Sequence, residues 1–154
     1  MNDTSERPAV EGLRPALAGS ARLEAGPLDV ADACRQYTEE GFDITPRLRV
    51  FLEAYGELTV TWTFKAGETD LSTSIERTLE APHATPRTTR IFTQRIGRSV
   101  IPVGAASSCT EDCILLADNG DILLGGDAGI QRVANGFEDA VRALVAGDWD
   151  KTFF

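Results

Sequence analysis

Residues 115–131 have the sequence LLADNGDILLGGDAGIQ, in which two apolar runs are joined by acidic residues and glycines. Both runs are apolar at successive positions, which is typical of strands that are covered on both faces in the middle of a sheet. Asn119-Gly120 readily adopts the positive φ angles of a tight type I′ turn. The stretch therefore predicts a hairpin of two buried strands, with a further strand near residues 129–133.

The acidic residues and glycines of this stretch do not match a metal-binding or phosphate-binding loop. Counted from Asp118, a calcium loop of the EF-hand type needs glycine at the sixth position, but glycine is already at the third. A phosphate loop needs lysine and then serine or threonine after its last glycine, which neither Gly125 nor Gly129 provides. We interpret Asp118 and Gly120 as turn residues. We expect the glycines of GGDAG to let the chain leave the sheet while Asp127 stays exposed.

Four segments have the apolar spacing of amphipathic helices, at residues 30–37, 48–55, 91–96 and 137–144. Thr45-Pro46 and Thr85-Pro86 each supply a hydroxyl that can cap a helix, followed by a proline suited to the first turn. Asn135 is expected to cap the last helix. The predicted helices are followed by glycines at positions 41, 56, 97 and 147.

Apolar residues alternate with threonines in LTVTWTF, residues 58–64, which predicts a half-buried strand. Residues 65–70 are interpreted as a turn, and LSTSIERT, residues 71–78, as a second antiparallel strand. SVIPVG, residues 99–104, predicts a short strand with Pro102 at an edge or strand end, because proline has no N–H to donate. Hairpins outnumber crossover connections, so we predict an α+β fold: a largely antiparallel mixed sheet flanked by about four helices.

The chain of 154 residues suits a single domain. Residues 1–27 mix proline, glycine, serine and charged residues with little periodicity, so we expect a flexible N-terminal extension before a folded domain at residues 28–154. No apolar stretch approaches the roughly 20 residues that span a bilayer, and the start lacks the pattern of a signal peptide. We expect a cytoplasmic protein without a membrane partner.

The net charge is −9, from 24 acidic and 15 basic residues. This charge disfavours direct binding of nucleic acid or of an anionic membrane, and it favours a basic protein partner. An acidic composition that only maintains solubility is the alternative.

The sequence contains no recognisable catalytic or metal-binding motif. Cys109 and Cys113 have a spacing that zinc accepts, but a structural site needs two further ligands, and only Cys34 and His83 remain in the preferred classes. An odd number of cysteines suits a reducing compartment, so we interpret them as packing or loop thiols. His83 is expected in an exposed turn, without a recognisable nucleophile beside it. We predict no enzyme activity, cofactor or metal.

Four segments in order, FLEAYGELTVTW, IGRSVIPVG, ILLADNGDILL and GFEDAVRALVAG, resemble the SUKH superfamily of bacterial immunity proteins, and its third group most closely. The matching positions are Tyr55, Gly56, Leu58, Gly97, Pro102, Gly104, Asp118, Gly120, Ala140, Leu144 and Gly147. Glu57 replaces the second glycine of the YGGL-like turn of this family. The resemblance covers about residues 29–150.

The resemblance implies a non-catalytic immunity protein that binds and neutralises a cognate polymorphic or contact-dependent toxin, such as a nuclease or a nucleic-acid deaminase. Acidic side chains on exposed turns can reach a basic cleft, so we expect Glu68, Asp70 and Asp127 to contact the toxin. The alternative is a regulatory protein-interaction or small-ligand-binding module on the same fold.

Overall fold

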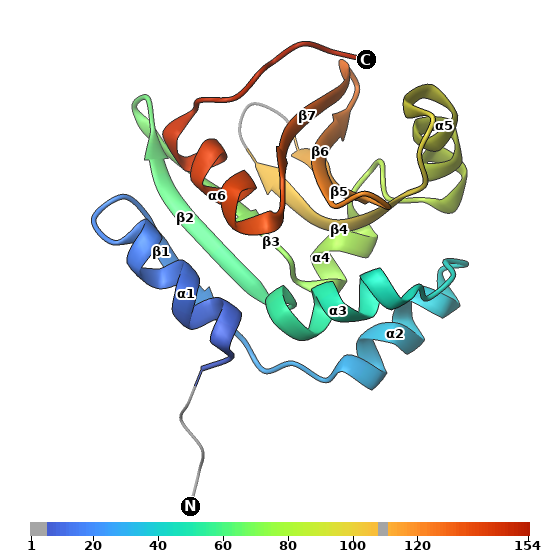
Figure 1. Ribbon diagram of the computed structural model, residues 1–154, viewed down its shortest axis with the longest axis horizontal. Helices are drawn as coiled ribbons and strands as arrows, with labels where there is room; N and C mark the ends of the chain where they lie inside the picture. Colours follow the sequence, from blue (N-terminus) through green and yellow to red (C-terminus); the bar gives the residue numbers. More distant parts are fainter. Residues whose placement is uncertain (1–5, 108–110) are drawn as a thin grey trace, which may run out of the picture.

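The computed structural model describes residues 6–107 and 111–154 (Figure 1). A seven-stranded antiparallel sheet forms its centre, and the strands follow one another in the sheet in chain order. The strands are β1 (Arg22–Ala25), β2 (Leu58–Phe64), β3 (Gly67–Ser72), β4 (Val100–Ser107), β5 (Glu111–Ala117), β6 (Asp121–Gly126) and β7 (Gly129–Asn135). The helices are α1 (Pro8–Leu17), α2 (Val30–Glu39), α3 (Pro46–Tyr55), α4 (Ile75–Glu80), α5 (Pro86–Ile96) and α6 (Phe137–Ala146). The α+β class is confirmed, with two more helices in the described residues than the sequence predicts.

Strands β4 to β7 are covered on both faces. Along β5, Ile114 and Leu116 belong to the large core that also contains side chains of α1, α2, α3 and α6. Cys113 and Leu115 face the other way, into a smaller cluster with Phe92 of α5. The alternation explains why this stretch is apolar at every position, and it confirms the prediction of buried central strands.

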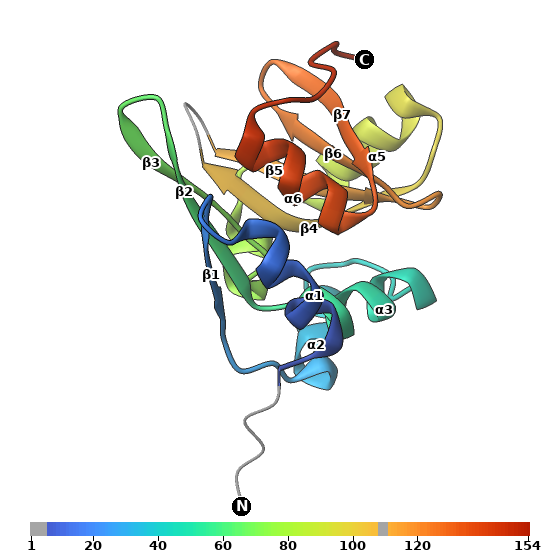
Figure 2. The ribbon, with the colours of Figure 1, turned by 60° about the vertical axis from the view of Figure 1, so that its left-hand side comes forward.

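Strands β1 and β2 are covered on one face only, whereas the end of β3 is also buried on its outer face, at Ser72. Leu58, Val60 and Trp62 of β2 are buried in the large core, and Figure 2 shows α1, α2, α3 and α6 on this side of β2. The threonines between them are half-buried or exposed on the outer face. This half joins the rest of the sheet through three residue pairs between β3 and β4, centred on Leu71 opposite Ala106.

The expectation of a flexible extension is wrong for residues 6–27, since α1 and β1 lie there; residues 1–5 fall outside the described residues. Val10, Leu13 and Leu17 recur on one face of α1 and are almost completely buried. Leu23 of β1 is buried too, and β1 pairs antiparallel with β2. The side chain of Arg7 donates to the Gly56 carbonyl, 2.6 Å away, and so ties the start of α1 to the end of α3.

Two of the predicted helix starts are confirmed by their hydrogen bonds. The hydroxyls of Thr45 and Thr85 accept the N–H groups of Leu48 and Thr88, each at 3.1 Å. The predicted strand at residues 71–78 is wrong beyond Ser72, because α4 follows. The predicted turn at residues 65–70 is also too long, since β3 already begins at residue 67.

The hairpin predicted at residues 118–120 is present, but its turn type differs. Gly120 has a φ of 93°, whereas Asn119 does not have a positive φ, so this is not a type I′ turn. The side-chain amide of Asn135 donates to the Asn119 carbonyl at 3.1 Å. Asn135 therefore closes this turn and does not cap α6, which begins after Gly136.

The glycines of GGDAG do not lead the chain out of the sheet. Gly125 and Gly126 are the last residues of β6, and Gly129 is the first of β7, so Asp127 and Ala128 form a two-residue turn. A Cβ at Gly125 would lie 2.8 Å from the Phe92 ring, which shows that glycine permits the close approach of α5.

Pro102 lies in an inner strand and not at an edge, which corrects the prediction. The register between β4 and β5 shifts between Pro102 and Gly104, and such a bulge tolerates the missing N–H. The hydroxyl of Tyr37 in α2 donates to the Pro102 carbonyl at 2.7 Å. A Cβ at Gly104 would lie 2.6 Å from the Ser72 carbonyl oxygen, so only glycine fits where β3 and β4 meet.

The turn between α3 and β2 combines a close approach with a left-handed residue. A Cβ at Gly56 would lie 2.7 Å from the Leu52 carbonyl oxygen. Glu57, at the position of the second family glycine, has a φ of 59°, a conformation that is costly for residues other than glycine. Its carboxylate accepts the N–H of Ile75 at 3.1 Å, in the first turn of α4, which offsets part of that cost.

Candidate partner-binding surface

One end of the sheet carries a group of acidic side chains from four separate segments. In an antiparallel sheet of this order, the β2–β3 and β6–β7 turns lie at the same end as the start of β5. Helix α4 packs against β4 and adds its own carboxylates beside Glu111. We call this surface the acidic hairpin end, and its residues are Glu68, Asp70, Glu76, Glu80, Glu111 and Asp127.

Arg77 of α4 organises the middle of the acidic hairpin end. Its guanidinium lies 2.9 Å from the carboxylate of Asp70 and 3.1 Å from that of Glu111. Partial burial opposes the charge of Arg77, but hydrogen bonds to these two carboxylates raise its pKa above the usual value. The two pairs fix the positions of Asp70 and Glu111 and leave the surface acidic as a whole.

Asp127 joins the surface from the β6–β7 turn. Its carboxylate lies 2.9 Å from Nε2 of His83, and its side chain is 89% exposed. The His83 side chain is only 21% exposed, so the expectation of an exposed histidine is wrong. The imidazole also lies near the Phe92 ring, with 6.3 Å between centroids, and therefore links the α4–α5 connection to this turn.

The structure places the three residues predicted from sequence in different surroundings. Glu68 is exposed on β3, two residues from Asp70, which is half-buried and paired with Arg77. Both lie on a strand and not in the predicted turn. Sequence reasoning missed Arg77, because residues 71–78 were taken as a strand. The Ser74 hydroxyl accepts the N–H of Arg77 at the start of α4. A serine that can cap a helix is therefore the sequence signal that indicates α4.

An open polar face adjoins the acidic hairpin end. Thr59, Thr61 and Thr63 of β2 lie on the outer face of the sheet, opposite Ser72, Asp70 and Glu68 of β3. Figure 2 shows no helix over the outer side of β1 and β2. Hydroxyls and carboxylates thus share a surface that is held in place by strand pairing.

The described part of the chain contains no group of three or more histidine, cysteine or acidic side chains that could hold a metal ion. Burial raises the pKa of the Cys113 thiol to about 12, which makes this thiol a poor nucleophile. Cys34 is buried as well. Cys109 lies outside the described residues, so the Cys109–Cys113 pair is not placed. No helix among residues 6–107 and 111–154 is long and apolar enough to cross a bilayer.

The structure is a small α+β domain with charged side chains held in place at one end of its sheet. The family model of the SUKH-3 immunity proteins matches residues 28–147, and the chain belongs to this family. Membership assigns it a general role in toxin immunity, with a cognate toxin as its partner. No curated protein and no solved structure shows significant similarity to the chain.

Proposed function

We propose that this protein neutralises its cognate toxin by binding it through the acidic hairpin end, so that a basic surface of the toxin is masked. The observation that carries the proposal is that six carboxylates from β3, α4, β5 and the β6–β7 turn lie at one end of the sheet, with Arg77 pairing Asp70 and Glu111 in their midst. Family membership supports toxin immunity, and the net charge of −9 supports a basic partner.

The carboxylates at this end fall into two groups with different roles. Asp70 and Glu111 form ion pairs with Arg77, and these pairs fix the position of α4 relative to β3 and β5. Glu68 has no ion pair within residues 6–107 and 111–154, and Asp127 is mostly exposed, so both can approach a lysine or arginine of the partner. Charges placed in this way accelerate association and oppose partners of the same sign. No step of bond making or breaking is needed, because occlusion of the toxin site is sufficient.

The test combines this protein with the toxin domain encoded beside it in the genome. We expect a stable complex by size-exclusion chromatography and growth rescue when both are produced together. Affinity should fall as salt rises. The double variant Glu68→Lys and Asp127→Lys should lower the association rate by at least about tenfold at low salt.

A matched control is Glu40→Lys, which changes the charge of an exposed residue at the end of α2. This variant should bind almost as well as the wild type. Equal losses per reversed charge for the control and for the double variant would show that only net charge matters, and no loss for either would place the contact elsewhere. A regulatory module without a toxin partner would give neither a complex nor rescue.

A further inference from the structure

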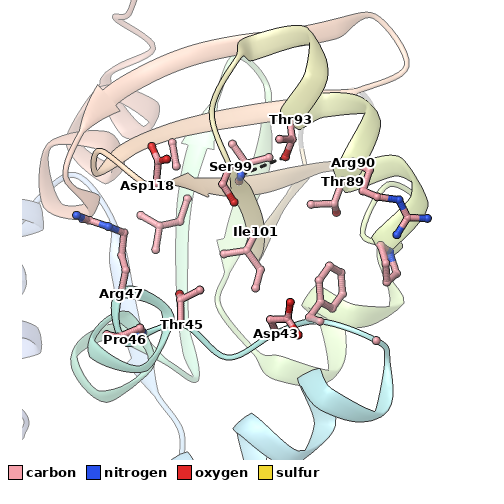
Figure 3. A pocket seen from close by; sticks show the side chains of 16 residues that line it. Asp43, Thr45, Pro46, Arg47, Thr89, Arg90, Thr93, Ser99, Ile101 and Asp118 are labelled. Atoms are coloured by element: carbon pink, nitrogen blue, oxygen red, sulfur yellow. Dashed lines mark hydrogen bonds between the residues drawn. The ribbon is translucent and has the colours of Figure 1, made fainter.

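A pocket of about 660 Å³ lies at the end of the sheet opposite the acidic hairpin end (Figure 3). Its walls are the α2–α3 connection, the first turn of α3, helix α5, the start of β4 and the end of β5. Phe42, Ile101 and Leu116 give it an apolar floor, and polar groups stand around them. Such a volume with mixed walls is in the range of small-molecule sites.

Thr89 of α5 supplies an unsatisfied polar group in this pocket. The residue is 6% exposed, and its hydroxyl has no hydrogen-bond partner in the part of the chain that the structure describes. The hydroxyls of Thr85 and Thr93 on the same helix are both used, as acceptors for the N–H groups of Thr88 and Val100. A buried hydroxyl without a hydrogen bond destabilises the free protein. A ligand atom that forms a hydrogen bond with it would remove this destabilisation, and binding would be stronger for that reason.

The charges around the pocket favour an anion in an otherwise acidic protein. Arg47 and Arg90 line opposite flanks in Figure 3, and neither has an ion pair among the described residues. Arg47 belongs to the first turn of α3, where the helix dipole adds positive potential. Of the two acidic residues that line the pocket, Asp118 is paired with Arg98 at 3.1 Å. Asp43 has no ion pair among the described residues, but it is exposed, so solvent screens its charge.

The sequence of α5 strengthens this local reversal of charge. The helix PRTTRIFTQRI carries three arginines and no acidic residue. From residue 81 to residue 107 the chain contains no aspartate or glutamate at all. The pocket is therefore bordered by a helix whose charge is opposite in sign to that of the acidic hairpin end.

We propose that this pocket binds a small amphipathic anion, with its apolar body against Ile101 and Leu116 and its carboxylate or other oxyanion in the positive potential of Arg47 and Arg90, which stand on the two flanks. The hydroxyl of Thr89 bonds a polar atom of the same ligand. This site is distinct from the acidic hairpin end and does not depend on the proposed toxin contact.

The test uses the full chain and the fluorescent anion anilinonaphthalene sulfonate, displaced by three competitors. Octanoate has both an anionic head and an apolar tail, octanol has only the tail, and acetate has only the head. We expect saturable binding of one dye molecule per chain, displaced by octanoate at a concentration at least about tenfold lower than by octanol or acetate. Equal potency of octanol and octanoate, or no dye binding to the folded protein, would overturn the proposal.

Three variants locate the binding. Ile101→Trp fills the pocket and Arg47→Glu reverses the charge of one flank, and each should weaken dye binding about tenfold or more. Arg95→Glu makes the same charge change on α5 outside the pocket lining and should leave binding within about twofold. Circular dichroism identifies a variant that fails to fold, in which case Arg90→Glu replaces it. Dye binding that survives both Arg47→Glu and Arg90→Glu would contradict the proposal.

Discussion

The two halves of the sheet differ in how far their outer faces are covered by helices. Strands β4 to β7 bury side chains on both faces, under α6 on one side and α5 on the other. Strands β1 to β3 bury one face along their length, and the other face presents threonines of β2 and carboxylates of β3, apart from the buried Ser72. Double coverage produces a rigid scaffold, whereas single coverage leaves a polar surface available to a partner. Substitutions in the two halves should therefore have unequal effects on stability.

The largest difference is expected between Leu115→Ala in β5 and Thr61→Ala in β2. Leu115 is 0% exposed, so its truncation leaves a cavity and should cost about 2–5 kcal/mol. Thr61 is only partly buried on the open face, and its replacement should cost no more than about 1 kcal/mol. Urea unfolding followed by circular dichroism measures both. Similar losses for the two variants would refute the contrast between the halves.

Gly104→Ala tests the narrow junction between the halves. The added Cβ would lie 2.6 Å from the Ser72 carbonyl oxygen, and a backbone atom cannot rotate away, so we expect a loss of about 1–3 kcal/mol. Gly67→Ala is the matched control, because nothing lies within 4 Å of its added Cβ. That variant should be neutral or slightly stabilising in thermal unfolding. A stable Gly104→Ala protein would mean that β3 and β4 can separate freely.

Tyr37→Phe removes the hydroxyl that donates to the Pro102 carbonyl at the β4 bulge, in the half of the sheet that is covered on both faces. The Pro102 carbonyl would lose its buried donor, at a cost of about 1–2 kcal/mol near neutral pH. Burial raises the pKa of Tyr37, so the stabilisation from its neutral phenol is full below the unfolded pKa of about 10 and declines above it. Unfolding at a series of pH values should show a smaller alkaline loss for Tyr37→Phe. Identical alkaline losses would contradict this assignment.

The smallest effects are expected at Glu57, where the singly covered half begins. Glu57→Ala keeps the left-handed backbone and loses the acceptor for Ile75 N–H, so it should cost about 1 kcal/mol. Glu57→Gly loses the same acceptor but relieves a strain of about 1 kcal/mol, so its net change should be close to zero. Chemical unfolding compares the pair. Equal destabilisation by alanine and glycine would show that the positive φ carries no cost.

Much of the fold could be predicted from the sequence because the signals were local. Threonine-proline pairs marked the starts of α3 and α5, and apolar periodicity marked α2 and α6. The unbroken apolar runs of β5 and β6 predicted burial on both faces. The failures came where a local signal was weak or had two interpretations. Residues 6–27 contain α1 and β1. These elements are stabilised by the burial of Leu13 and Leu23 in a core formed mainly by residues far along the chain.

The acidic hairpin end could be predicted only in part. Glu68, Asp70 and Asp127 are recognisable as acids near turns, but their spacing says nothing about Arg77 or Glu111, which lie on other elements. Their association depends on the end of the sheet at which each strand finishes and on the position of α4. The pocket could not be predicted from the sequence for the same reason, since Arg47, Thr89 and Ile101 belong to three separate segments.

The sequence by itself determined the α+β class, the family and the acidic character of this protein, because these depend on composition and on patterns within about a dozen residues. The tertiary structure decided which charges meet and which remain unpaired. Asp70 is paired with Arg77, whereas among the described residues Glu68 has no ion pair and the buried Thr89 hydroxyl has no hydrogen-bond partner. The physical reason is that ion pairing and the desolvation of polar groups act over a few ångströms in space. The residues involved are far apart in the sequence and meet only in the folded chain.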